Sequence, residues 1–229
     1  MSDAQSASQP AAQRIDAAVA ERAMLSHPFY QAWTEGRLSL PTLREYARQY
    51  FHHVEAFPRA VSAVHANCPD AEGRRMLAEN LAEEEGLGAE RQPHASLWLD
   101  FAEALGATEE DVRDVEINPE TQALIDTFRR LSRKSYAAGL GALYAYESQF
   151  PAVATSKIEG LARYDVTEER AIRFFEVHQQ ADVEHSSVCR ALLDELSEEE
   201  RDEAAAAGQE LAGALWGFLN GVERTTRLN

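Results

Sequence analysis

Apolar positions along this chain recur every three to four residues, which is the period of an α-helix. The segment over residues 14–25, RIDAAVAERAML, shows the pattern first, and residues 27–36 continue it as a second short helix. Ser39 is a favoured N-cap for a longer helix over residues 41–66, which has a proline in its first turn. The first part of the chain is therefore predicted to be helical.

Glycines, prolines and capping residues divide the rest of the chain into further helical segments. The expected helices cover residues 70–85, 93–105, 119–135, 136–157, 168–196 and 198–224. The sequence lacks the alternation that is typical of β-strands. We therefore predict an all-α fold, with seven or more helices around one core. Residues 14–229 are assigned to this single domain and residues 1–13 to a disordered tail.

Charge and composition restrict the possible partners of the chain. The 229 residues carry a formal net charge of −17, and such a surface repels nucleic acid and anionic membranes. The two cysteines, Cys68 and Cys189, are too few for a disulfide framework, which fits a reducing compartment. The N-terminus lacks the features of a secretory signal, and no run of about 18 apolar residues is present. We therefore expect a cytoplasmic protein without nucleic-acid or membrane partners.

The segment FFEVHQQADVEHSSVCR places three potential metal ligands on one helix face. At about 100° per residue, the side chains of His178, Asp182 and His185 fall within an arc of about 60°. Burying two imidazoles and a carboxylate is costly, and a divalent cation relieves that cost. These ligand types suit iron or manganese, whereas thiolates would suggest zinc or an iron–sulfur cluster. The alternative is that all three are ordinary polar residues of the core or surface.

Two other segments could add ligands. Glu147 lies in the apolar segment YAYESQF, where a surface role is hard to explain. The segment NLAEEEGLGAERQPHASLW carries Glu83, Glu84 and Glu85, followed by His94 next to apolar residues. A run of glutamates is ordinarily solvated, but these could supply carboxylates that bridge two metals inside a helix bundle. The sequence alone leaves open which of the three glutamates does so.

Four separated segments, HPFYQAW, NLAEEEGLG, YAYESQFP and HQQADVEH, together resemble the haem-oxygenase-like diiron oxidases. Within that family, the chain is most similar to CADD-type 4-aminobenzoate synthases, named for chlamydial proteins that associate with death domains. The resemblance implies a compact seven-helix bundle of the TenA and PqqC kind. It also implies two metal ions, Fe/Fe or Fe/Mn, and O2 as co-substrate. The implied ligands are Glu84, His94, Glu147, His178, Asp182 and His185.

The same resemblance implies a self-sacrificing reaction that makes 4-aminobenzoate for folate biosynthesis. It places the source of the aromatic ring at Tyr30 and the amino donor at Lys157, in a chain with few lysines. Tyr46, Tyr50 and Tyr146 could line the cavity and carry an electron between the metals and Tyr30. The alternatives are a solvated lysine near a helix end and tyrosines that only pack in the core. We do not expect His52, His53 and His65 to be ligands.

Three other functions remain open at this point. One is a dimetal oxidase that acts on an amino acid or a fatty acid, and a second is a metal-free protein of the TenA or PqqC kind. TenA-type chemistry needs a nucleophilic cysteine, and no matching motif surrounds Cys189. The third is a non-enzymatic interaction module. The expected partners are O2, an unidentified reductant and a second copy of the chain in a homodimer.

Overall fold

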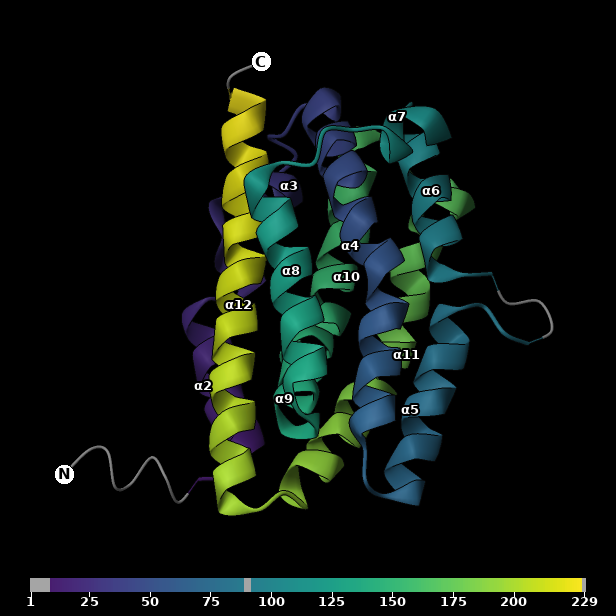
Figure 1. Ribbon diagram of the computed structural model, residues 1–229. Helices are drawn as coiled ribbons and strands as arrows, with labels where there is room; N and C mark the ends of the chain where they lie inside the picture. Colours follow the sequence, from purple (N-terminus) through teal and green to yellow (C-terminus); the bar gives the residue numbers. More distant parts are fainter. Residues whose placement is uncertain (1–8, 89–91, 228–229) are drawn as a thin grey trace.

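The computed structural model describes residues 9–88 and 92–227, and every regular element in these ranges is a helix (Figure 1). In chain order the elements are α2 (Ala11–Glu21), η1 (Met24–Ser26), α3 (Pro28–Thr34), α4 (Leu40–Asn67), α5 (Ala71–Glu84), α6 (His94–Ala104), α7 (Glu109–Arg113), α8 (Pro119–Lys134), α9 (Tyr136–Glu147), α10 (Phe150–Leu161), η2 (Ala162–Tyr164), α11 (Glu169–Asp194) and α12 (Glu198–Arg227). The all-α prediction is confirmed.

Capping side chains begin several of these helices where the sequence indicated. The Ser39 hydroxyl accepts a hydrogen bond from the Thr42 N–H at 3.2 Å and begins α4.

The predicted start of the first helix was wrong. Helix α2 begins at Ala11 rather than Arg14, because Ala11 and Ala12 are fully buried against the core. Residues 11–13 therefore belong to the fold, whereas residues 1–8 of the predicted tail lie outside the described residues.

The single helix expected over residues 136–157 is two helices. α9 ends at Glu147 and α10 begins at Phe150, with Ser148 and Gln149 between them. Pro151 explains the break, because proline has no N–H to donate to the carbonyl of Glu147 and its ring clashes with that carbonyl. Glu147 and Lys157 therefore lie on different helices, so their side-chain directions are not related by rotation about one helix axis.

Helix α9 lies inside the bundle, and its residues from Ala137 to Glu147 are all buried. Helix α12 packs along α9, α8 and α2, and α11 packs against α10, α6 and α9 (Figure 1). The contact between α9 and α12 is very close at Gly141, where an added Cβ would lie 2.1 Å from the Ala204 carbonyl oxygen. Only glycine permits this approach. The tight packing holds the C-terminal end of α9 in the interior.

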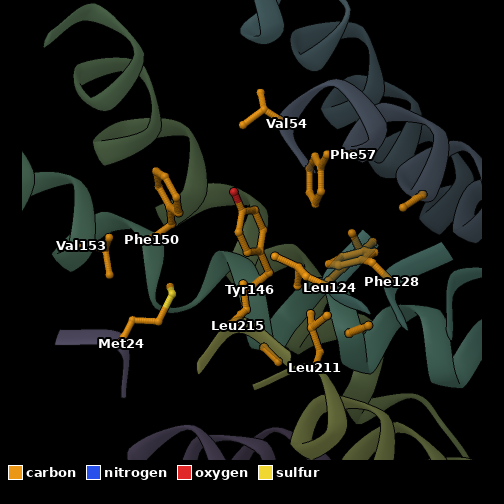
Figure 2. Packing of buried hydrophobic residues seen from close by; sticks show 14 of the residues in the cluster. Met24, Val54, Phe57, Leu124, Phe128, Tyr146, Phe150, Val153, Leu211 and Leu215 are labelled. Carbon is orange, nitrogen blue, oxygen red and sulfur yellow. The ribbon is translucent and has the colours of Figure 1, made fainter. Parts of the chain in front are cut away.

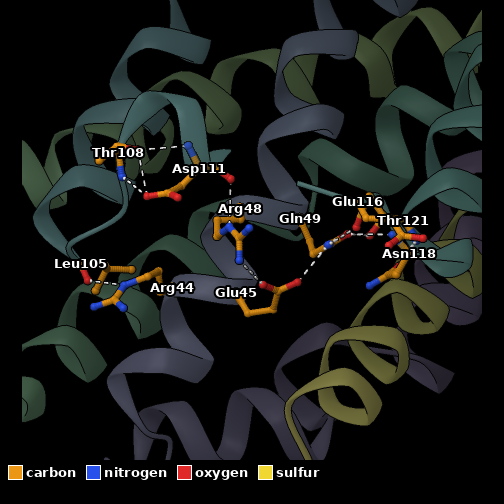
Figure 3. A network of polar contacts seen from close by, with 10 residues as sticks. All are labelled: Arg44, Glu45, Arg48, Gln49, Leu105, Thr108, Asp111, Glu116, Asn118 and Thr121. Atoms are coloured by element: carbon orange, nitrogen blue, oxygen red, sulfur yellow. Dashed lines mark hydrogen bonds and ion pairs between the residues drawn. The ribbon is translucent and has the colours of Figure 1, made fainter. Parts of the chain in front are cut away.

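A buried amide anchors α4 to the start of α8. The Gln49 side chain, 1% exposed, accepts hydrogen bonds from the Asn118 N–H and the Thr121 hydroxyl, both at 3.0 Å. It donates to the carboxylate of Glu45 and to the Glu116 carbonyl, so all its polar atoms are satisfied (Figure 3). This network fixes the position of α4, which also carries Tyr46 and Tyr50.

None of the described helices is both long and apolar enough to cross a lipid bilayer.

Candidate metal centre

Six buried side chains form two neighbouring clusters, each with three potential ligands. The N and O atoms within each cluster lie within 4.8 Å of one another. The first cluster is Glu84, His94 and His178, and the second is Glu147, Asp182 and His185. These are the six residues named from the sequence. They are brought together by the end of α5, the start of α6, the end of α9 and one face of α11.

The first cluster brings potential nitrogen and oxygen ligand atoms close together. His178 donates from Nδ1 to the Phe174 carbonyl at 2.7 Å, so its Nε2 is left as a free acceptor. The Nδ1 atom of His94 lies 2.8 Å from Glu84 Oε2, yet no hydrogen bond has suitable geometry there. Glu84 Oε1 lies 4.0 Å from His178 Nε2. A hydrogen bond that fixes the far nitrogen of a histidine is typical of metal-binding sites.

The second cluster is supported by neighbours that hold its carboxylates. Glu147 accepts a hydrogen bond from the Asn80 amide at 2.8 Å and another from the Cys189 thiol at 3.3 Å. His185 Nδ1 lies 3.4 Å from Asp182 Oδ1 without forming a hydrogen bond, and the other Asp182 oxygen has no partner among the described atoms. Asp182 Oδ2 is therefore a buried acceptor that needs a cation or a proton.

The structure distinguishes the three glutamates that the sequence left open. Glu84 is 4% exposed and lies in the first cluster, whereas Glu85 is exposed to solvent. Glu83 is half-buried and lies 3.1 Å from the Nε2 atom of His185. Sequence reasoning missed this contact of Glu83 and the support that Asn80 gives to Glu147. An asparagine on the buried face of a predicted helix was the available signal for the second.

Lys157 is enclosed by aromatic rings next to the first cluster. It is 2% exposed, and its Nζ atom lies 4.6 Å from the ring centre of Tyr46 and 4.9 Å from that of Tyr30. The other rings within 5.7 Å are those of Trp33, Tyr50, Trp98, Phe150 and Phe175. We call this set the lysine cage. Burial lowers the pKa of Lys157 well below its ordinary value, which favours the neutral amine.

Contacts between buried phenols extend from the lysine cage to Tyr146. The Lys157 amine donates to the Tyr46 hydroxyl, which lies 2.9 Å from the Tyr30 hydroxyl. The Tyr46 ring stacks on Tyr50 with 5.6 Å between centres, and the Tyr50 hydroxyl donates to that of Tyr146 at 3.0 Å. Tyr146 directly precedes Glu147 in α9. The tyrosines named from the sequence therefore lie in contact with one another, and Lys157 is not a solvated residue.

The sequence was compared with known families and proteins once this geometry was established. A family model described as "Iron-containing redox enzyme" matches residues 44–226. A relative from Chlamydia pneumoniae, named 4-aminobenzoate synthase, is 41% identical over 93% of this chain and 94% of its own length. The chain belongs to the iron-containing redox enzyme family.

The fold of this chain is similar to those of solved structures. A TenA homologue from Pseudomonas syringae superposes with a TM-score of 0.80 at 20% identity, over 96% of this chain and 95% of its own. A domain with a haem-oxygenase-like fold from Shewanella denitrificans gives a TM-score of 0.77 at 18% identity, over 95% and 90% of the two chains. The predicted haem-oxygenase-like and TenA-like bundle is confirmed.

The two clusters fit the iron that the family name implies. Three imidazoles and three carboxylates are nitrogen and oxygen donors that suit iron or manganese. Within the described structure, the buried atoms His94 Nδ1 and Asp182 Oδ2 have no hydrogen-bond partner of suitable geometry. Burying such polar atoms is costly, and a bound cation relieves the cost. Glu84, His94 and His178 would hold one ion, and Glu147, Asp182 and His185 a second.

Protons take the place of cations in the metal-free protein. Burial raises the pKa of Glu147 to about 7 and that of Asp182 to about 6. Burial lowers the pKa of His185, but its contacts with Asp182, Glu147 and Glu83 outweigh this and raise it to about 9. All three groups hold a proton in the native protein at pH values where they would release it in the unfolded chain.

We expect the stabilisation by bound metal to increase with pH. The three raised pKa values mean that the metal-free protein loses stability as pH rises from about 4 to 9, whereas bound metal displaces these protons. The difference in Tm between iron-loaded and chelated protein should therefore be larger at pH 8 than at pH 5.5, by about 5 °C or more. Differential scanning fluorimetry measures it, and an unchanged difference would contradict the assignment of these groups as ligands.

Proposed function

We propose that this chain is a 4-aminobenzoate synthase that consumes its own Tyr30 as the ring source and its own Lys157 as the amino donor. The observation that carries the proposal is the contact of the buried Lys157 amine with the Tyr46 hydroxyl, which pairs with the Tyr30 hydroxyl. Relatives with this printed name, such as the Chlamydia pneumoniae protein at 41% identity, support it. When bound, the two metal ions would supply the oxidising chemistry, with O2 as co-substrate.

The lysine cage prepares the amine for transfer to carbon. Aromatic rings exclude water from Nζ, and burial lowers the pKa of Lys157, so the nitrogen keeps a lone pair. One N–H of the amine is held on the Tyr46 oxygen, and the Tyr46 hydroxyl then orients the Tyr30 phenol. Nitrogen and phenol are thereby positioned inside one dry compartment.

The other tyrosines supply buried hydroxyls that extend from this compartment to Tyr146, which precedes Glu147 in α9. Burial raises the pKa values of Tyr46, Tyr50 and Tyr146 well above the ordinary value, so each holds its proton at neutral pH. A buried phenol can lose an electron only if its proton moves to a neighbour at the same time. The Tyr50–Tyr146 pair, with 3.0 Å between oxygens, provides such a neighbour. We propose that these phenols carry charge toward Tyr30.

Isotope labelling tests the source of both parts of the product. Chain made with ring-13C tyrosine and 15N lysine should, after iron loading, reduction and exposure to O2, yield 4-aminobenzoate that carries both labels. The yield should not exceed one molecule per chain. Unlabelled product, or many molecules per chain, would show that the substrate is a separate small molecule.

A matched control uses the fact that the sequence contains only two lysines, Lys134 and Lys157. Lys134 lies at the surface, where it pairs with Glu203 at 2.9 Å. In a Lys134→Arg variant all remaining 15N label resides at Lys157, and the product should be labelled as before. Loss of the nitrogen label in this variant would assign the amino donor to Lys134 and contradict the proposal.

The cysteine in the site does not favour a thiaminase function. Cys189 is 1% exposed, and its thiol donates to the Glu147 carboxylate. Burial raises the pKa of this thiol well above its ordinary value, with the neighbouring Glu147 acting in the same direction. A nucleophilic cysteine requires the opposite shift and access to a substrate. The similarity to TenA structures is therefore a similarity of fold.

A further inference from the structure

A cavity of about 240 Å³ lies between α4 and α8, apart from both metal clusters and the lysine cage. Its apolar walls include Phe57, Phe128, Ile117 and Ile125. Phe57 and Phe128 stand next to the Tyr146 ring, and their own ring centres are 5.5 Å apart (Figure 2). Sites for drug-sized ligands have volumes of about 300–1,000 Å³, so this space suits a smaller molecule with a single ring.

The inner wall of the cavity carries unsatisfied histidine nitrogens. His53 is 1% exposed, and its Nε2 atom has no hydrogen-bond partner within the described part of the chain. The half-buried His52 also lines the cavity, and its Nε2 likewise lacks a partner there. Burial lowers the pKa of His53 to about 3, so this imidazole is neutral and can accept or donate one hydrogen bond. A buried polar atom without a partner indicates a missing ligand or water.

Arginines surround the opening, although the chain as a whole carries a net charge of −17. Arg59 and Arg133 are exposed at the rim and form no ion pair with any described residue. Arg129 also lines the cavity and pairs at 2.5 Å with Asp126, which does not line it. The acidic residue of the lining, Glu55, is held by Arg113 at 2.9 Å. The rim is therefore locally positive and suited to an anion.

We propose that this cavity binds a small, planar, aromatic monocarboxylate. The carboxylate lies at the rim with Arg59 and Arg133, the ring packs on Phe57 and Phe128, and a polar group at the far end reaches His53. The natural occupant is 4-aminobenzoate, a choice that rests on the proposed function. Its anionic and amino ends match the two ends of the cavity.

The position of the cavity gives this binding a role after synthesis. The His53 ring lies 5.2 Å from the Tyr146 ring and 5.1 Å from the Tyr50 ring, measured between centres. The rings of His53, Phe57 and Phe128 therefore lie between the cavity and Tyr146. A product bound in this cavity lies outside the lysine cage and next to solvent. A following enzyme can take the product from this position.

Calorimetric titration of the purified full-length chain with 4-aminobenzoate tests the proposal. We expect saturable 1:1 binding with a Kd below about 1 mM. Arg133→Gln should weaken binding about tenfold, because a hydrogen bond to a charged group is lost. His53→Phe, which keeps an aromatic ring but removes Nε2, should weaken it severalfold. Ala56→Phe, which fills the cavity without altering charge, should abolish it.

Two controls separate this site from non-specific attraction. Arg163→Gln removes an exposed arginine of η2 that does not line the cavity, and it should leave the Kd unchanged. The uncharged analogue 4-aminobenzamide should bind about tenfold more weakly. The proposal is wrong if the chain does not bind 4-aminobenzoate, or if Arg133→Gln and Arg163→Gln have equal effects. A chain that synthesises the compound without binding it contradicts this inference alone. One that binds the compound without synthesising it contradicts the proposed function alone.

Discussion

Replacing His178 by alanine is expected to reduce the iron content of the purified chain at least about tenfold at limiting iron. His178 Nε2 faces Glu84 and His94, while its Nδ1 is fixed by the Phe174 carbonyl. Removing the imidazole takes one of three ligands from the first cluster, and loss of even an outer partner of a ligand costs about 10- to 100-fold in metal affinity. Elemental analysis after iron loading and desalting measures the loss.

The matched control for this variant is His65→Ala. His65 lies near the end of α4, partly buried and outside both clusters. This variant should retain the full iron content. Circular dichroism of both variants confirms that the helices remain, so that a fall in iron content is not caused by unfolding. Equal iron content in the His178→Ala variant and the unaltered chain would contradict the metal site.

Tyr30→Phe is expected to abolish formation of 4-aminobenzoate while leaving the iron content unchanged. The phenylalanine keeps the ring but lacks the hydroxyl that pairs with Tyr46, which in turn accepts from the Lys157 amine. The cost in stability should be about 1 kcal/mol, the typical value for one hydrogen bond, so the variant should fold. Chromatography of the reaction after reduction and exposure to O2 measures the product.

Tyr164→Phe is the matched control, because it also removes one hydrogen-bonded tyrosine hydroxyl. The Tyr164 hydroxyl accepts a hydrogen bond from the Leu38 N–H at 3.0 Å and donates to the Trp33 carbonyl at 3.2 Å, but its ring is not one of those in the lysine cage. This variant should still form the product. If Tyr30→Phe also forms it in unchanged amount, Tyr30 is not the source of the ring, although a metal-dependent reaction on another substrate would still be compatible with the clusters.

The grouping of ligands on α11 could be predicted because it depends on local geometry. His178, Asp182 and His185 follow one another at intervals of four and three residues, and any regular helix places such residues on one face. Burial of that face followed from the flanking phenylalanines, and all three residues are buried. The isolated Glu147 in an apolar segment was informative for the same reason. Their role as ligands remains a prediction.

Other parts of the site depend on tertiary packing and could not be predicted from local sequence patterns. Neighbouring residues in a helix differ by about 100° in direction, so the choice among Glu83, Glu84 and Glu85 depends on how α5 is rotated against α11. Lys157 was harder to place, since lysines near helix ends are ordinarily solvated. Its burial follows from the break before Phe150, which redirects α10 into a group of aromatic rings from several helices.

The position of three candidate ligands on one uninterrupted helix also affects how the sequence can change. α11 runs from Glu169 to Asp194 without a break, and its His178 serves the first cluster while Asp182 and His185 serve the second. One residue inserted or deleted between His178 and Asp182 would rotate Asp182 and His185 by about 100° around the helix axis relative to His178. Substitutions at the intervening outward positions would leave the geometry intact. This stretch should therefore vary in composition among homologues but keep a constant length.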